Sequence, residues 1–116
     1  AAGADAFTRS WRSGTRVTGD RASTFAEGMA TRVTFDLTFD ILRRELTDIV
    51  TLTEEELASG VRLALDATPH LAEGAGAASL AAAVKLRDRL RGKRVVCVMS
   101  GGNIDRATLS RILAAA

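Results

Sequence analysis

The sequence predicts an α/β domain with helices packed on a short parallel sheet. The strongest indication is residues 94–99, an apolar and β-branched run that reads Arg-Val-Val-Cys-Val-Met. Such a run is typical of a central strand covered on both faces. Helical patterns precede it, and a glycine-rich turn and another helix follow it, so strands and helices alternate as in α/β proteins. The length of 116 residues fits one domain.

The N-terminal part is predicted to hold two short helices joined by a long loop. The first covers residues 4–11 and ends at Gly14, and turn-forming residues dominate 14–24. Residues 24–30 form a compact segment. The second helix covers 36–46, with one apolar face made by Phe35, Phe39, Leu42 and Leu46.

The middle of the chain carries the clearest helix start. After a short β-prone run at 48–52, Thr53 and Glu56 have the spacing of a capping box. The helix that they open is predicted to reach about Ala67, and Pro69 prevents it from continuing. Its buried stripe is predicted to be Leu57, Val61, Ala64 and Leu65.

Two more helices are predicted in the C-terminal part. One begins after Glu73 and runs to about Arg91, where Gly92 breaks it. Its first turns are almost entirely Gly and Ala, so a second backbone or a ligand can approach closely. The other begins at about Asp105, with Leu109, Ile112 and Leu113 facing inward.

Composition excludes several classes of function. The net charge is only +2, and basic residues are interspersed with acidic ones, so no basic stripe for nucleic acid is present. No stretch approaches the roughly 18 apolar residues of a membrane span. The single cysteine, Cys97, reads as a small buried hydrophobe. This usage fits a reducing compartment, and we expect a cytoplasmic protein.

The turn after the predicted strand is the first candidate site. Ligands of open α/β sheets bind off the carboxyl ends of the strands. Ser100 is the first polar side chain there, and Gly101 and Gly102 allow a ring or a phosphate to approach the backbone. Gly-Gly-Asn also suits a plain tight turn, and this pattern alone leaves both interpretations open.

Glu73 is the second candidate. A carboxylate at a helix N-terminus is stabilised by the helix dipole, and the residues alone favour a cap over a ligand contact. His70 has no obvious partner and is interpreted as structural, and Asp5 as part of a solvated face.

Six segments in this order resemble the fold-type-II pyridoxal-phosphate enzymes, above all the threonine dehydratase and serine racemase group. The resemblance covers nearly the whole chain. It implies that residues 1–116 are the C-terminal portion of the large, three-layer catalytic domain found in tryptophan-synthase-β-like enzymes. The segments are Ser10-Trp11, Thr24-Phe25-Ala26-Glu27-Gly28, 44–50, Thr53-Glu54-Glu55-Glu56, 72–77 and Met99-Ser100-Gly101-Gly102-Asn103-Ile104-Asp105.

The resemblance also implies roles for particular residues. Ser100 would hydrogen-bond the pyridine nitrogen of pyridoxal 5'-phosphate, and a neutral partner there suits β-elimination. Gly28, Gly101 and Glu73 would lie beside the cofactor. A divalent cation such as Mg²⁺, Mn²⁺ or Ca²⁺ would bind the carbonyl of Gly3 and the carboxylate of Asp5. Glu27 departs from the family pattern, which has Asp more often.

The family's Schiff-base lysine and phosphate-binding loop have no counterpart here. Neither Lys85 nor Lys93 lies in the family's lysine context. We therefore expect no catalytic residue in this chain and no activity from it alone.

The resemblance implies that the parent enzyme dehydrates and deaminates L-threonine or L-serine to a 2-oxo acid and ammonia. Serine racemase, a dehydratase of another hydroxy-amino acid, and a non-catalytic α/β module for a ligand or partner chain remain open. We expect a small hydroxy-amino acid as substrate. We also expect a homodimer, or association with an N-terminal part that carries the lysine.

Overall fold

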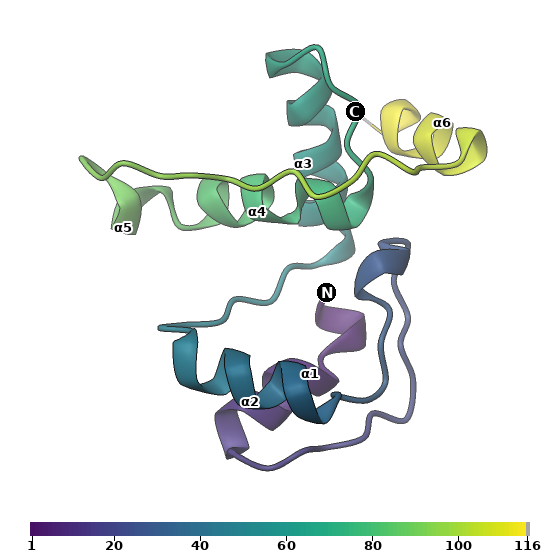
Figure 1. The fold of residues 1–116 in the computed structure, drawn as a ribbon. Helices are drawn as coiled ribbons and strands as arrows, with labels where there is room; N and C mark the ends of the chain where they lie inside the picture. Colours follow the sequence, from purple (N-terminus) through teal and green to yellow (C-terminus); the bar gives the residue numbers. More distant parts are fainter. Residues whose placement is uncertain (116) are drawn as a thin grey trace.

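The computed structural model describes residues 1–115, which fold into two helical groups connected by extended segments (Figure 1). One group holds the first two α-helices, and the other holds the remaining ones. The helical segments are η1 (Ala2–Ala4), α1 (Ala6–Ser13), η2 (Glu27–Met29), α2 (Asp36–Glu45), α3 (Glu54–Ala67), α4 (Gly74–Lys85), α5 (Arg87–Leu90) and α6 (Arg106–Ala114), where η marks a 3₁₀-helix.

Helices α1 and α2 pack against each other through an aromatic pair. The rings of Phe7 and Phe39 meet edge to face, with centroids 6.3 Å apart. Helix α1 ends at Gly14, as predicted, because this residue adopts a left-handed conformation with φ of 75°. Its N–H donates to the carbonyl of Ser10 over 2.9 Å and closes the last turn.

The predicted apolar face of α2 is only partly buried. Phe39 is buried, whereas Phe35 is 65% exposed and Leu42 is also exposed. Leu46 is half-buried and lies just beyond the end of the helix. The spacing placed these residues on one face correctly, but among residues 1–115 the packing against α1 covers only part of that face.

Helix α3 begins as the sequence predicts. The Thr53 hydroxyl accepts from the N–H of Glu56 over 3.2 Å, and the Glu56 carboxylate accepts from the N–H of Thr53 over 2.8 Å. Leu57, Val61 and Ala64 are buried, and Leu65 is half-buried.

Two apolar clusters form the core, and both include residues of α3 and α4. One joins Leu57 of α3 to Ala81 of α4 and to the N-terminal segment, and the other joins Val61 to Ile112 of α6. Phe25 packs against both clusters from the loop before η2.

The helix predicted from Glu73 to about Arg91 is interrupted. Helix α4 ends at Lys85, Leu86 leaves the helical conformation, and the four-residue α5 follows. Nothing in the structure explains the interruption at Leu86. The predicted stop at Gly92 is confirmed by its φ of 72°.

The predicted parallel sheet is not confirmed. Within residues 1–115 no strand is present, and 94–99 runs as an extended segment beside α4 (Figure 1). A strand needs a hydrogen-bonded neighbour, and no extended segment pairs with this one within the described part of the chain. Val96 is accordingly 89% exposed rather than buried.

The last predicted helix is confirmed as α6. Asp105 is its N-cap, and its carboxylate accepts from the N–H groups of Ala107 and Thr108 over 2.9 Å each. Ile112 is buried, Leu109 is half-buried, and Leu113 is 46% exposed. No helix in the described residues is both long and apolar enough to cross a membrane.

Candidate functional site

The loop that follows the extended segment is tied to α4 at two points. The Ser79 hydroxyl of α4 donates to the carbonyl of Val98 over 2.8 Å. The N–H of Glu73 donates to the carbonyl of Gly101 over 3.1 Å. These two bonds bracket Ser100, which is exposed and whose hydroxyl makes no hydrogen bond within residues 1–115. The structure therefore fixes the backbone of this loop and leaves the serine hydroxyl free for a ligand.

Glu73 occupies the N-cap position of α4 but does not cap it. Its backbone is extended, and its carboxylate accepts no hydrogen bond from the first turn of the helix. The carboxylate lies against Gly101 instead, so close that a Cβ on Gly101 would overlap Oε1. The sequence favours Glu73 as a helix cap. Glu73 does occupy the N-cap position, but its side chain makes no capping hydrogen bond.

The small residues at the start of α4 bring backbones together. A Cβ on Gly76 would overlap the carbonyl oxygen of Gly101. A Cβ on Gly74 would lie 2.6 Å from Cε2 of Phe25 and 3.1 Å from Cα of Ala26. The close approach predicted for this segment is thus made by two loops of the chain itself, and both loops carry candidate site residues.

Gly28 lies at the same end of α4. It belongs to η2, and a Cβ there would lie 3.0 Å from the Cβ of Ala75. The loop before it is closed by the Thr24 hydroxyl, which accepts from the N–H of Ala26 over 3.1 Å. Gly28 and Gly101 therefore both lie against the first turn of α4, which Glu73 precedes, and Ser100 is next to Gly101 in the loop.

Two cavities are lined by candidate site residues. One, of about 460 Å³, is lined by His70, Leu71, Met99, Ser100, Gly101 and Gly102. The other, of about 310 Å³, is lined by Thr24, Phe25, Glu27, Glu73, Gly74, Asn103, Ile104, Asp105, Thr108 and Arg111. Ser100 and Gly101 line the first cavity and Glu73 lines the second, whereas Gly28 lines neither.

Asp105 contributes a fixed negative charge to the second cavity. Hydrogen bonds from the side chain and then the N–H of Thr108 hold the pKa of this carboxyl below its usual range. The role of Asp105 is therefore to cap α6. Its hydrogen bonds to the first turn of this helix also fix the end of the loop that begins at Ser100.

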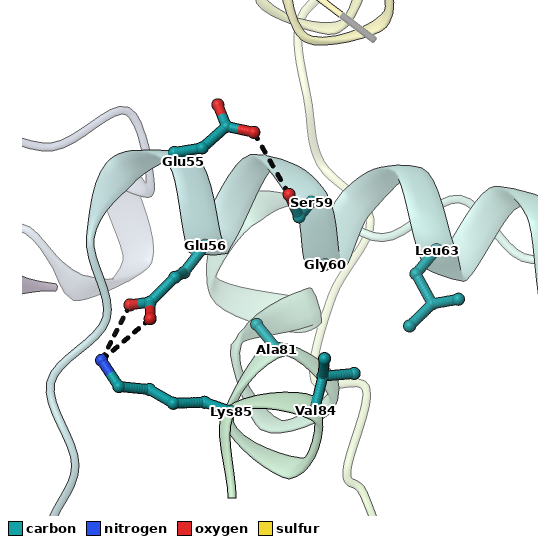
Figure 2. A pocket seen from close by; sticks show the side chains of 8 residues that line it. All are labelled: Glu55, Glu56, Ser59, Gly60, Leu63, Ala81, Val84 and Lys85. Carbon is teal, nitrogen blue, oxygen red and sulfur yellow. Dashed lines mark hydrogen bonds and ion pairs between the residues drawn. The ribbon is translucent and has the colours of Figure 1, made fainter. Parts of the chain in front are cut away.

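A third cavity lies between α3 and α4, away from the predicted site (Figure 2). It measures about 270 Å³ and is lined mainly by apolar groups, among them Leu63 and Val84. At its edge the Lys85 ammonium pairs with the Glu56 carboxylate over 2.9 Å. Lys85 also donates to the carbonyl of Thr51 over 3.0 Å, which gives it a structural role. None of the predicted site residues lines this cavity.

The predicted cation site at Gly3 and Asp5 gains no support. The Gly3 carbonyl accepts from the N–H of Ser23 over 2.9 Å. The Asp5 carboxylate pairs with Arg9 over 3.0 Å, and Arg21 lines the same cavity. The Asp5 carboxylate is thus already paired with a guanidinium group, and the cavity is lined by two arginines as well as by Asp5 and Asp20, so its lining does not favour a bound cation. No group of three or more His, Cys, Asp or Glu side chains arranged for a metal occurs in the described residues.

Two residues that bond to the segments carrying the candidate site residues were not predicted from the sequence. Ser79 holds Val98, and Glu54 accepts from the N–H of Phe25 over 2.9 Å. A serine among the alanines of α4 was a visible signal. Nothing in the sequence distinguishes Glu54 from Glu55, because both fit the first turn of a helix and neither has the spacing of the capping box.

Comparisons with known proteins give a consistent picture. Residues 1–101 match the family model described as "Pyridoxal-phosphate dependent enzyme". An L-threonine ammonia-lyase of Thermotoga maritima is 39% identical over 90 residues, which are 78% of this chain and 22% of that protein. A serine racemase of Schizosaccharomyces pombe is 34% identical over 97 residues, which are 84% of this chain and 30% of that protein. The chain thus spans less than a third of the length of either relative.

Solved structures agree with these matches. The processed form of threonine deaminase isoform 2 from Solanum lycopersicum superposes with a TM-score of 0.89 at 25% identity, over 98% of this chain and 34% of that one. A second threonine deaminase, from T.th., gives a TM-score of 0.81 at 34% identity, over 89% of this chain and 38% of that one.

Proposed function

Because the chain belongs to the pyridoxal-phosphate-dependent enzymes, we propose that its full-length protein dehydrates and deaminates L-threonine or L-serine to a 2-oxo acid and ammonia. Similarity to the L-threonine ammonia-lyase of Thermotoga maritima and to threonine deaminases of known structure supports this reaction. One observation of the structure carries the proposal. Glu73, at the N-cap of α4, leaves its helix uncapped and places its carboxylate against the glycine that follows Ser100.

The residues at this end of α4 fit pyridoxal phosphate. Gly28 and Gly101 have no side chain to shield their backbone, and the Ser100 hydroxyl is exposed without a partner within residues 1–115. When bound, the cofactor supplies an electron sink for the charge left at Cα as a proton departs. In our proposal the Ser100 hydroxyl donates to its pyridine nitrogen. Glu73 and the glycines border the ring, and the bonds to Ser79 and Glu73 keep the loop in place.

The wider architecture is part of the same proposal. We place the chain in the three-layer catalytic domain of fold type II and pair the extended segment 94–99 with strands from outside this chain. Val96 and Val98, which are 89% and 69% exposed, support such a neighbour because a β-branched apolar run gains most when both faces are covered. The Schiff-base lysine then also lies outside this chain.

The proposal also includes association of this chain with the rest of the protein or with a second copy. Besides the valines of 94–99, the exposed apolar side chains include Val33, Phe35, Leu37 and Ile41 around α2. Exposed apolar groups gathered in one region mark contact surfaces. They support association with the rest of the protein or with a second copy. A cytoplasmic location rests on the use of Cys97 and stays a prediction.

Serine racemase is the second candidate, favoured by the relative from Schizosaccharomyces pombe. A dehydratase of another hydroxy-amino acid is a variant of the first, since an L-threo-3-hydroxyaspartate ammonia-lyase of Pseudomonas sp. is 35% identical over 97 residues. All three candidates would share the cofactor. The two dehydratases differ in their substrate, and the racemase differs from both in the fate of the substrate.

A parallel assay separates these reactions. The purified full-length protein, loaded with pyridoxal phosphate, is given L-threonine, L-serine and L-threo-3-hydroxyaspartate in turn. Release of 2-oxo acid is measured for each substrate, and formation of D-serine is measured for L-serine. We expect 2-oxobutyrate or pyruvate as the main product. D-serine as the main product would replace the dehydratase with the racemase, and loading without any cofactor absorbance would overturn the proposal.

A further inference from the structure

Glu54 reaches from the first turn of α3 to the loop that carries Gly28. Its Oε2 accepts a hydrogen bond from the backbone N–H of Phe25 over 2.9 Å. Side-chain bonds from a helix start usually serve the helix itself, as the one between Glu56 and Thr53 does. The bond of Glu54 instead joins two elements that are 29 positions apart in the sequence.

Phe25 transmits this restraint to the start of α4. Its ring packs over Gly74, where a Cβ would come within 2.6 Å of Cε2. It also contacts both apolar clusters, so it lies at the junction of the core. Three residues further on, Gly28 rests against Ala75 in the same turn of α4. Fixing the backbone of Phe25 therefore fixes where Gly28 lies relative to Glu73.

The neighbouring glutamates have other partners. The Glu56 carboxylate caps α3 and pairs with Lys85, and the Glu55 carboxylate pairs with Arg62. Within residues 1–115, the bond to Phe25 is the only hydrogen bond or ion pair that the Glu54 side chain makes. The three adjacent carboxylates thus have three different sets of partners, and the partner of Glu54 is the loop that carries Gly28.

We propose that Glu54 is a positioning residue for the cofactor site, which holds the loop 24–28 against the first turn of α4 through the N–H of Phe25. This role rests on the proposed function, because Gly28 matters to the cofactor only if pyridoxal phosphate binds beside it. Glu54 itself does not touch the cofactor.

Two substitutions separate the bond from the charge. Glu54→Asp keeps the carboxylate at the N-terminus of α3 but is one methylene shorter, so it no longer reaches Phe25. Glu54→Gln loses the charge and keeps an acceptor oxygen at the same reach. Glu55→Gln removes a charge from the same turn without touching the loop and serves as the matched control.

Two measurements on the full-length protein test the proposal. The Kd for pyridoxal phosphate is obtained by fluorescence titration of the cofactor-free protein, and exchange of the Phe25 amide by hydrogen–deuterium exchange. We expect Glu54→Asp to raise the Kd about tenfold and to speed the exchange of Phe25, as for the loss of a charge-assisted hydrogen bond. Glu54→Gln stays within about threefold of wild type in both measurements, because a neutral acceptor retains about half of such a bond. Glu55→Gln changes neither.

The outcomes distinguish this inference from the proposed function. If Glu54→Asp exposes the Phe25 amide but binds the cofactor as wild type does, the positioning role is refuted while the proposed function stands. If Glu54→Gln and Glu54→Asp weaken binding equally, charge rather than the bond to Phe25 is responsible, which also refutes it. A wild-type protein that binds no pyridoxal phosphate contradicts both.

Discussion

Helices α3 and α4 begin with nearly the same backbone and use it in opposite ways. The N-cap of α3, Thr53, has φ of −73° and ψ of 167°, and the N-cap of α4, Glu73, has −75° and 171°. Thr53 closes a complete capping box, whereas Glu73 makes no capping bond. The start of α3 is stabilised by its own residues. The start of α4 depends on the loop 100–102 packed against it, and this leaves a carboxylate for another task.

The largest expected effect concerns the packing at the start of α4. Gly76→Ala places a Cβ into the carbonyl oxygen of Gly101, where backbone lies on both sides. We expect a loss of about 2 kcal/mol or more in the free energy of unfolding, although alanine favours the helix itself. Urea denaturation of the full-length protein measures this loss.

Gly60→Ala is the matched control within the same helix pair. A Cβ there meets the methyl of Ala81 at 2.9 Å and the carbonyl oxygen of Ala77 at 3.0 Å, both on α4, and this overlap is smaller than the one at Gly76. We expect its cost to be the smaller of the two. If Gly76→Ala were neutral, the start of α4 would not depend on the loop.

The second effect concerns the start of α3. Thr53→Ala removes the acceptor for the N–H of Glu56, and we expect it to cost about 1 kcal/mol. Thr53→Ser, which restores a hydroxyl, should recover most of that loss. Because the Thr53 hydroxyl bonds only Glu56 and not the loop 24–28, the Kd for pyridoxal phosphate should change much less than in Glu54→Asp. A rise in that Kd as large as in Glu54→Asp would show that the helix cap, and not only the bond of Glu54 to Phe25, supports cofactor binding.

A third effect is the acid sensitivity of the α3 start. Hydrogen bonding from the N–H of Thr53, and then from Lys85, holds the pKa of Glu56 below its usual value near 4.5. A lowered pKa in the folded state stabilises the protein above that usual value, and this stabilisation is lost as the pH falls through the folded pKa. The free energy of unfolding, measured by urea denaturation from about pH 6 to about pH 3, should therefore fall less steeply in Glu56→Gln. An identical slope in both proteins would contradict the role of Glu56.

The smallest effect on stability is expected at Glu73. Its carboxylate makes no hydrogen bond within residues 1–115, so Glu73→Gln should change the free energy of unfolding by less than about 0.5 kcal/mol. The Kd for pyridoxal phosphate should nevertheless rise. A clear loss of stability with unchanged cofactor binding would make Glu73 an ordinary helix cap.

Helix starts and ends that depend on residues close together in the sequence could be predicted. The capping box of Thr53, the end of α1 at Gly14 and the start of α6 at about Asp105 are local patterns, and all three are confirmed. Contacts between distant segments could not be predicted in this way. The carboxylate of Glu73 meets Gly101, and Glu54 meets Phe25, only because the fold brings these segments together.

Two predictions, the buried strand at 94–99 and the buried apolar face of α2, were not fully confirmed for the same reason. The apolar pattern of 94–99 and the face of α2 describe surfaces that need a partner. Within residues 1–115 the first has no neighbouring strand and the second is covered only around Phe39. Spacing identifies an apolar face, but it does not say which segment covers it.

The most direct test of the site is Ser100→Ala in the full-length protein, with Ser110→Ala, an exposed serine of α6, as control. The absorbance spectrum of the bound cofactor and the turnover of L-threonine are measured together. If the Ser100 hydroxyl donates to the pyridine nitrogen, Ser100→Ala shifts the spectrum and lowers turnover about tenfold or more, as for the loss of a buried hydrogen bond to the reacting group. Ser110→Ala leaves both as they are. Normal absorbance and normal turnover in Ser100→Ala would contradict the account.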